Sequence, residues 1–256
     1  MWCEAFSDSE EYVNHFFDSN CAKTYVYTED DTPVGMVSVF DISLNEKKGG
    51  YIYALVVDKQ HRGKGVACRL LQFVDKTLKT SGYDFSLAVP SPYESLEPFY
   101  KRFGFDREVK LGVAEFDRTE NCFEFDFEKA TAQEYQVARQ NKDGIVLHTD
   151  EFYNYIYEDL VSEGVEILKI RTESKNIFCV CYNNGEYVIM KELLGETNPE
   201  KIAQIVMKIF DVPKAFVVSS KGENYYPYAL FRSLRPNFDF DEIYANLLLD
   251  DFENRF

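Results

Sequence analysis

The stretch Gln60-His61-Arg62-Gly63-Lys64-Gly65-Val66-Ala67 decides the fold of this 256-residue chain. Before it, residues 51–57 form a continuous run of β-branched, aromatic and aliphatic side chains that is too short for a typical helix, which predicts a buried strand. After it, apolar residues recur at helical spacing as far as Ser81-Gly82, which predicts a helix. The stretch is therefore expected to be a glycine-rich connection between a strand and a helix.

The start of this helix suits a phosphate group. Gly63 and Gly65 let the backbone approach a ligand closely, and the first N–H groups of a helix are unpaired donors with a partial positive charge. Arg62 and Lys64 add two full positive charges at a place where helices ordinarily carry acids. We therefore expect the turn to bind a pyrophosphate. The alternative is a glycine-rich turn that binds nothing.

The turn departs from the two commonest phosphate motifs. A Walker loop needs Ser or Thr after Gly-Lys, but Gly63-Lys64 is followed by Gly65, and the spaced third glycine of the dinucleotide fingerprint is absent. The turn resembles motif A of the GNAT superfamily of acetyl-CoA-dependent N-acetyltransferases, Gln/Arg-x-x-Gly-x-Gly/Ala, with Gln60, Gly63 and Gly65 at the motif positions. Farther on, Phe99-Tyr100-Lys101-Arg102-Phe103-Gly104-Phe105 resembles the ending of the family's motif B.

This resemblance implies the fold class and the cosubstrate. The fold would be the α+β GNAT fold, in which helices flank a mixed, mostly antiparallel sheet, and acetyl-CoA would supply the acetyl group. The resemblance assigns acetyl-CoA binding to the backbone of the strand, which would pair with the pantetheine arm, and to the turn, which would cradle the pyrophosphate. These residues are Leu55, Val56, Val57, Gln60, His61, Arg62, Gly63, Lys64, Gly65, Val66 and Ala67.

Tyr100 is the general acid by the same resemblance, and would protonate the departing thiolate of coenzyme A. A tyrosine with a pKa near its usual value of about 10 is protonated at neutral pH, so the chemistry fits. The alternative is a tyrosine that only packs beneath the sheet.

No general base can be assigned from the sequence. Many family members carry a Glu or Asp on the strand before motif A, but residues 50–57 contain no carboxylate. The open alternatives are a water chain or one of four acids, namely Asp41, Glu46, Glu94 and the terminal carboxylate of Phe256.

The opening segment follows the order expected for the family. Residues 9–17 are predicted to form a helix capped by Ser7 or Asp8, and residues 25–27 and 34–42 a hairpin. In the family the opening helices wall the acceptor pocket, so the resemblance offers Phe16, Phe17 and Tyr25 as acceptor contacts, with core packing as the alternative for each.

The second half repeats the strand, helix, strand order with a different turn. Residues 187–194, 199–210 and 215–219 are the predicted elements, and Gly195-Glu196-Thr197-Asn198-Pro199 joins the first two with one glycine, no cation and one acid. We therefore predict tandem lobes, with a catalytic domain over residues 1–128 and a degenerate GNAT-like domain over residues 129–256. Tyrosine-rich segments 153–157 and 225–228 are candidate acceptor walls, or inter-lobe packing.

Composition narrows the partners. The net charge is −16, and both halves are acidic, with 14 basic and 23 acidic residues in the first and 14 and 21 in the second, so nucleic acid is not expected as a partner. The N-terminus lacks a secretory pattern, no membrane-spanning run is present, and the three histidines lack ligand spacing. We expect a cytoplasmic protein without a metal or a membrane partner, whose oligomeric state the sequence does not define.

The predicted function is direct acetyl transfer from acetyl-CoA to a primary amine on a small molecule or peptide. The alternative is a GNAT-like protein that senses acyl-CoA or a small ligand without turnover. A Tyr100→Phe change separates the two, because only an enzyme has turnover to lose.

Overall fold

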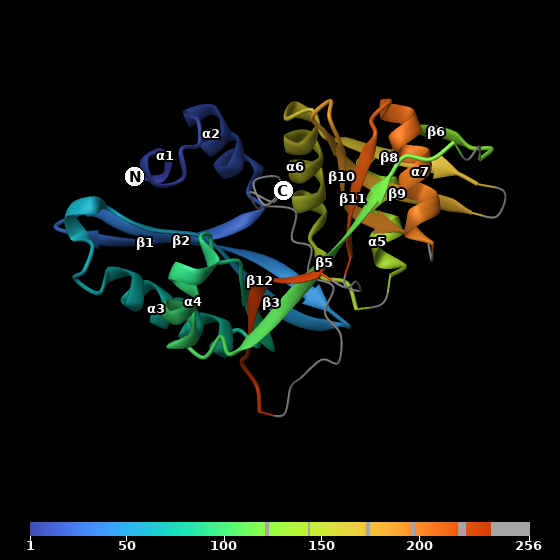
Figure 1. The fold of residues 1–256 in the computed structure, drawn as a ribbon. Helices are drawn as coiled ribbons and strands as arrows, with labels where there is room; N and C mark the ends of the chain where they lie inside the picture. The colour runs from blue at the N-terminus through green and yellow to red at the C-terminus, as the bar shows by residue number, and fades with distance from the viewer. Residues whose placement is uncertain (121–122, 143, 173–174, 196–197, 220–223, 237–256) are drawn as a thin grey trace. The chain divides into compact units, whose positions relative to one another are not determined.

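The computed structural model describes residues 1–236 apart from 121–122, 143, 173–174, 196–197 and 220–223 (Figure 1). The chain divides into two compact units. Unit 1 comprises Met1–Val109, Leu147–Tyr155 and Tyr228–Asp241, and unit 2 comprises Lys110–Val146, Ile156–Pro227 and Glu242–Phe256. Each unit is described by itself below.

Unit 1 is built on strands in the order β1-β2-β3-β4-β12, and β7 also pairs with β2. The strands are β1 (Ala22–Glu29), β2 (Thr32–Leu44), β3 (Lys47–Val57), β4 (Phe85–Ala88), β7 (Leu147–His148) and β12 (Asn224–Ser233). Only the β3/β4 pair is parallel, and the pairs β1/β2, β2/β3 and β4/β12 are antiparallel. The sheet is therefore mixed and mostly antiparallel, as predicted.

Helices cover both faces of strands β1 to β3 (Figure 1). They are α1 (Trp2–Phe6), α2 (Glu10–Ser19), the 3-10 turn η1 (Lys59–His61), α3 (Val66–Thr80) and α4 (Tyr93–Lys101). On the α3 side, Leu70, Leu71 and Val74 pack with Val37, Val39 and Ile52 of the sheet. On the α1 and α2 side, the ring of Phe16 contacts those of Phe40 and Tyr53. This arrangement places the start of α3 at the end of β3, where the sequence predicts the phosphate turn.

Unit 2 repeats the strand, helix, strand order of unit 1. Its strand order is β5-β11-β10-β9-β8-β6, and β10/β11 is the parallel pair in this part of the sheet. The strands are β5 (Arg107–Asp117), β6 (Asp126–Lys129), β8 (Glu166–Arg171), β9 (Asn176–Asn183), β10 (Val188–Leu194) and β11 (Lys214–Ser219). The helices from this half of the chain are α5 (Ala132–Gln140), α6 (Asp150–Ser162) and α7 (Pro199–Phe210).

One local prediction needs correction. The cap of α2 is Ser9, whose hydroxyl accepts from the Tyr12 N–H at 3.0 Å, because Ser7 instead ends α1 in the left-handed conformation. The last strand of unit 1 comes from the end of the described chain: β12 pairs with β4 from Leu230–Ala88 to Ser233–Phe85. The predicted domain boundary lies between residues 128 and 129 and divides the chain into two consecutive repeats. Each compact unit instead combines three separate segments of the chain, and the domain boundary stays a prediction.

Candidate active site

The glycine turn has the backbone that the sequence predicts. Gly63 and Gly65 have φ values of 75° and 81°, in the left-handed region that favours glycine. Gly65 is the N-cap of α3, no side chain caps the helix, and its first turn contains no acid. A Cβ added to either glycine would meet no protein atom within 4 Å. The turn thus leaves room for a ligand over donors of the kind that bind anions.

Side chains around Asp58 fix the shape of this turn. The Asp58 carboxylate accepts the Gln60 N–H at 3.0 Å and lies 3.3 Å from His61 Nδ1, and these contacts, the backbone bond first, lower the pKa of Asp58. Arg62 Nε donates to the Val57 carbonyl at 3.0 Å, while Lys64 is exposed. The backbone of η1 is therefore held before α3 begins. The His61 side chain contacts Asp58 and so stabilises the conformation of the turn.

Strand β3 provides an edge for an extended ligand. Its pairing with β4 runs from Gly49–Phe85 to Ile52–Ala88, and within the described residues no strand pairs with β3 on this side beyond Ile52. A bulge follows, at the register shift between Met36–Val56 and Ser38–Tyr53, where Ala54 has a φ of 47°. We call the backbone of residues 54–57 the open edge. It contains the predicted Leu55, Val56 and Val57 and ends eight residues before Gly65.

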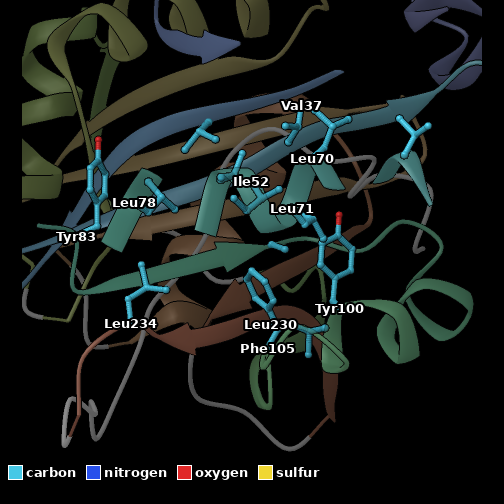
Figure 2. Close-up of a cluster of buried hydrophobic side chains, with 14 of the residues drawn as sticks. Val37, Ile52, Leu70, Leu71, Leu78, Tyr83, Tyr100, Phe105, Leu230 and Leu234 are labelled. Carbon is cyan, nitrogen blue, oxygen red and sulfur yellow. The ribbon is translucent and has the colours of Figure 1, made fainter. Parts of the chain in front are cut away.

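Tyr100 lies in the apolar core on the α3 side. Only 7% of its surface is exposed, and its ring makes edge contacts with Phe99 and Phe105 at centroid distances of 5.3 and 5.6 Å. In Figure 2 its hydroxyl points toward the part of the cluster that contains Leu70 and Leu71. Burial raises the pKa of Tyr100 well above the usual value of a tyrosine. Tyr100 is therefore protonated at neutral pH, as an acid must be.

Asp41, the first candidate base, belongs to another cluster. It pairs with Gly50 in the sheet, seven residues from Val57, which is roughly 23 Å along a strand. Lys23 Nζ lies 2.8 Å from its carboxylate, and the Tyr83 hydroxyl also donates to it. Burial and the bond to Asp41 raise the pKa of Tyr83 to about 12. The Asp41 carboxylate therefore makes its contacts near the start of β3, away from the open edge.

The other candidate bases are not brought to the open edge either. Glu46 is exposed at the β2–β3 turn, beyond Asp41 on the same hairpin. Glu94 is exposed in the first turn of α4, six residues before Tyr100 and so on a different face of that helix. The carboxylate of Phe256 lies outside the described residues.

The three proposed acceptor contacts are divided between the two faces of the sheet. Phe16 is 2% exposed and packs on the α1 and α2 side, while Phe17 of the same helix is 42% exposed. The ring of Tyr25 lies 5.5 Å from Phe73 of α3, which places it on the opposite face. Tyr155, from the first candidate wall, stacks on His15 at 5.1 Å, so the start of α6 joins the aromatic packing of unit 1.

The corresponding turn of unit 2 is closed by its own side chain. The Asn198 side chain accepts the Lys201 N–H at 3.2 Å, and Pro199 occupies the first turn of α7, as predicted. The sequence did not indicate the buried charges near this turn. Arg139 Nη1 lies 3.3 Å from the carboxylate of Glu192, Arg139 also donates to the Val146 carbonyl at 2.7 Å, and both side chains are fully buried.

Comparison with known proteins decides the family. Residues 1–105 match the sequence profile of the acetyltransferase (GNAT) family. These residues belong to the GNAT acetyltransferase family. The match spans η1, the open edge, α3 and Tyr100, so it covers the proposed general acid and every residue that the sequence proposes for cosubstrate binding. Members of the GNAT family are acetyltransferases that use acetyl-CoA.

Solved structures share the fold of the GNAT domain and of the rest of the chain. A probable N-acyltransferase from Enterococcus faecalis V583 is 13% identical, with 91% of this chain and 68% of that one covered and a TM-score of 0.76. A GCN5-related N-acetyltransferase from Anabaena variabilis ATCC 29413 is also 13% identical, with 90% and 67% covered and a TM-score of 0.69. A tandem GNAT protein from the clavulanic acid biosynthesis pathway is 8% identical, with 91% and 98% covered and a TM-score of 0.51.

A search of curated proteins gave no match. Of the helices in the described part of the chain, none combines the length and apolarity needed to cross a membrane. The described side chains also include no cluster of three or more His, Cys, Asp or Glu that would suit a metal ion. The expectations of a cytoplasmic location and of no metal stay predictions.

Proposed function

We propose that the protein is an acetyl-CoA-dependent N-acetyltransferase that transfers the acetyl group directly from the thioester to a primary amine. One observation carries this proposal: the open edge of β3 leads into an uncapped, glycine-lined start of α3. An extended pantetheine arm fits the first feature as an added strand, and a pyrophosphate fits the second. Bound acetyl-CoA would supply an activated acetyl group.

Backbone and side-chain groups of the turn contribute differently to binding. The N–H groups from Arg62 to Ala67 provide donors for the pyrophosphate, and the exposed Arg62 and Lys64 provide charge. The N–H groups near Val57 polarise the thioester carbonyl, and the rate comes chiefly from holding the two reactants together. Tyr100 gives its proton to the sulfur when the carbon–sulfur bond breaks, and regains one from solvent.

Calorimetric titration with acetyl-CoA tests the binding half of this proposal. We expect micromolar binding by the wild type and its loss in the Arg62→Glu/Lys64→Glu variant, because four units of charge change beside the pyrophosphate. A Lys47→Glu/Lys76→Glu variant is the matched control, since both lysines are exposed and lie away from the turn. Equal weakening in both variants would show a general charge effect, and no binding by the wild type would overturn the proposal.

Thiol release with a panel of primary amines tests the catalytic half. We expect Tyr100→Phe to bind acetyl-CoA as the wild type does and to lose about 10²-fold or more in turnover, the usual contribution of a general acid. The competing proposal is a protein that senses acyl-CoA without turnover, which the lack of a carboxylate in residues 50–57 favours. Tight acetyl-CoA binding without thiol release for spermidine, tyramine, kanamycin or a dipeptide would support that competing function.

A further inference from the structure

A pair of tyrosines lies next to the open edge. The hydroxyls of Tyr12 on α2 and Tyr53 on β3 are 3.0 Å apart and share a hydrogen bond, and both residues are half-buried. Tyr53 directly precedes the bulge at Ala54 and directly follows Ile52, the last residue of β3 that pairs with β4. It is therefore the side chain at the point where the two strands separate.

Tyr53 reaches this point from the face of the sheet opposite Tyr100. Ile52 packs with Tyr100 in the cluster on the α3 side, and successive side chains of a strand alternate between faces. The ring of Tyr53 accordingly contacts Trp2, Phe16 and Phe40, with centroid distances of 5.9, 5.7 and 5.4 Å. A group between β3 and β4 would thus have one tyrosine on each side.

The reaction needs two such groups acting on different atoms. The departing sulfur needs a proton, and the attacking nitrogen must lose one. A hydroxyl is both donor and acceptor, so a hydrogen-bonded pair can pass a proton along without holding a net charge. Residues 50–57 offer no carboxylate for this task. Tyr12 lies on α2, within residues 1–21, and these residues include five acids and no lysine or arginine. Such a segment favours an approaching ammonium group.

We propose that Tyr53 is a second catalytic residue, which accepts the proton of the attacking amine, and that Tyr12 is a positioning residue that passes a proton on to solvent. This inference rests on the proposed acetyltransferase function. The ammonium first loses one proton to water, and the neutral amine nitrogen then bonds to the carbonyl carbon. The carbon–sulfur bond breaks, and sulfur keeps the electron pair and takes the proton of Tyr100, which is then replaced from water. The nitrogen's proton moves to the Tyr53 oxygen as the proton of Tyr53 moves to Tyr12 and that of Tyr12 moves to water. Both tyrosines end neutral.

The test uses the full chain and the amine that the wild type acetylates fastest among spermidine, tyramine, kanamycin and a dipeptide. We expect Tyr53→Phe to lower kcat about 10²-fold with unchanged acetyl-CoA affinity by calorimetry. We also expect the same amine to bind the complex of Tyr53→Phe with CoA about fivefold more weakly, because one hydrogen bond is lost. Tyr12→Phe should lower kcat less, and the double variant should be no slower than Tyr53→Phe, since Tyr12 acts only through Tyr53.

A matched control and three outcomes that would contradict the proposal complete the design. Tyr182→Phe removes a half-buried hydroxyl from β9 of unit 2, which has no part in the proposed site, and should leave both kcat and amine binding unchanged. If the wild type transfers acetyl groups and Tyr53→Phe stays within twofold of it, the relay is wrong while the acetyltransferase function stands. If the two single losses multiply in the double variant, Tyr12 does not act through Tyr53. A wild type that transfers nothing overturns both proposals.

Discussion

A single methyl group at Gly65 should separate the structural role of the turn from its role in binding. Gly65 has a φ of 81°, so Gly65→Ala forces an L side chain into the left-handed region at a cost of about 1–2 kcal/mol. For a chain of this size that corresponds to a fall in Tm of roughly 2–8 °C. The added Cβ meets no protein atom within 4 Å, so no clash adds to this cost.

The effect on acetyl-CoA binding should be larger than that strain explains. The new methyl group would stand at the N-cap of α3, where the proposed pyrophosphate needs close approach to the backbone. We expect the Kd for acetyl-CoA to rise at least tenfold, which is a loss of about 1.4 kcal/mol or more. Isothermal calorimetry measures this loss, and differential scanning calorimetry of the same samples measures Tm.

Gly82→Ala is the matched control, because Gly82 lies just past the other end of α3 with a φ of 79° and space for a Cβ, whose nearest neighbour is the Arg235 side chain at 3.9 Å. It should lower Tm by a similar amount and leave the Kd unchanged. The reasoning is refuted if Gly65→Ala binds acetyl-CoA as tightly as Gly82→Ala does.

Three further predictions concern stability. Leu230→Ala, on β12 in the core of unit 1, should cost about 2–5 kcal/mol in urea unfolding and show that residues late in the chain stabilise the GNAT domain; an unchanged midpoint would contradict this. Arg139→Met should cost about 3–5 kcal/mol because it leaves the buried Glu192 without its cation, and Arg139→Met/Glu192→Leu should recover most of the loss; a double variant as unstable as the single one would contradict this. A hydrogen bond from Lys169 and the N–H of Thr131 lower the pKa of Glu134 from 4.5 to about 2, so its stabilisation is complete above pH 4.5 and lost as pH falls toward 2. The stability difference between wild type and Glu134→Gln should therefore shrink over that range, and a constant difference would refute the assignment.

The sequence was sufficient where local rules decide the structure. Glycines with cations at a helix start predicted the turn, the spacing of apolar residues predicted α3, and a capping side chain followed by Pro199 predicted the start of α7, because these signals depend on neighbours along the chain. It was insufficient where distant segments meet. Nothing in residues 224–233 alone indicates pairing with β4, and the Tyr12–Tyr53 hydrogen bond joins residues 41 positions apart. Tyr51 and Tyr53 share a face of β3, and their rings lie 5.9 Å apart, but what packs on that face depends on tertiary structure.

The two parallel strand pairs allow the proposed site in unit 1 to be compared with the corresponding part of unit 2. In unit 1 the β3/β4 pairing ends at Ile52, and the bulge follows at Ala54. In unit 2 the β10/β11 pairing ends at Met190, and a register shift follows between Met190 and Glu192. The strand geometry is therefore similar in both units, while the turns differ.

The difference lies in what satisfies each helix start. In α3 the N-cap is a glycine without a capping side chain, whereas in α7 the Asn198 side chain takes one of the donors that a phosphate would use. The residue after the register shift also differs: it is the apolar Val56 in unit 1, whereas in unit 2 it is Glu192, a buried carboxylate that pairs with Arg139. We therefore predict that a cosubstrate site requires the glycine turn as well as the strand bulge. If that is correct, acetyl-CoA should bind with a stoichiometry of one per chain, and Asn198→Gly alone should not create a second site.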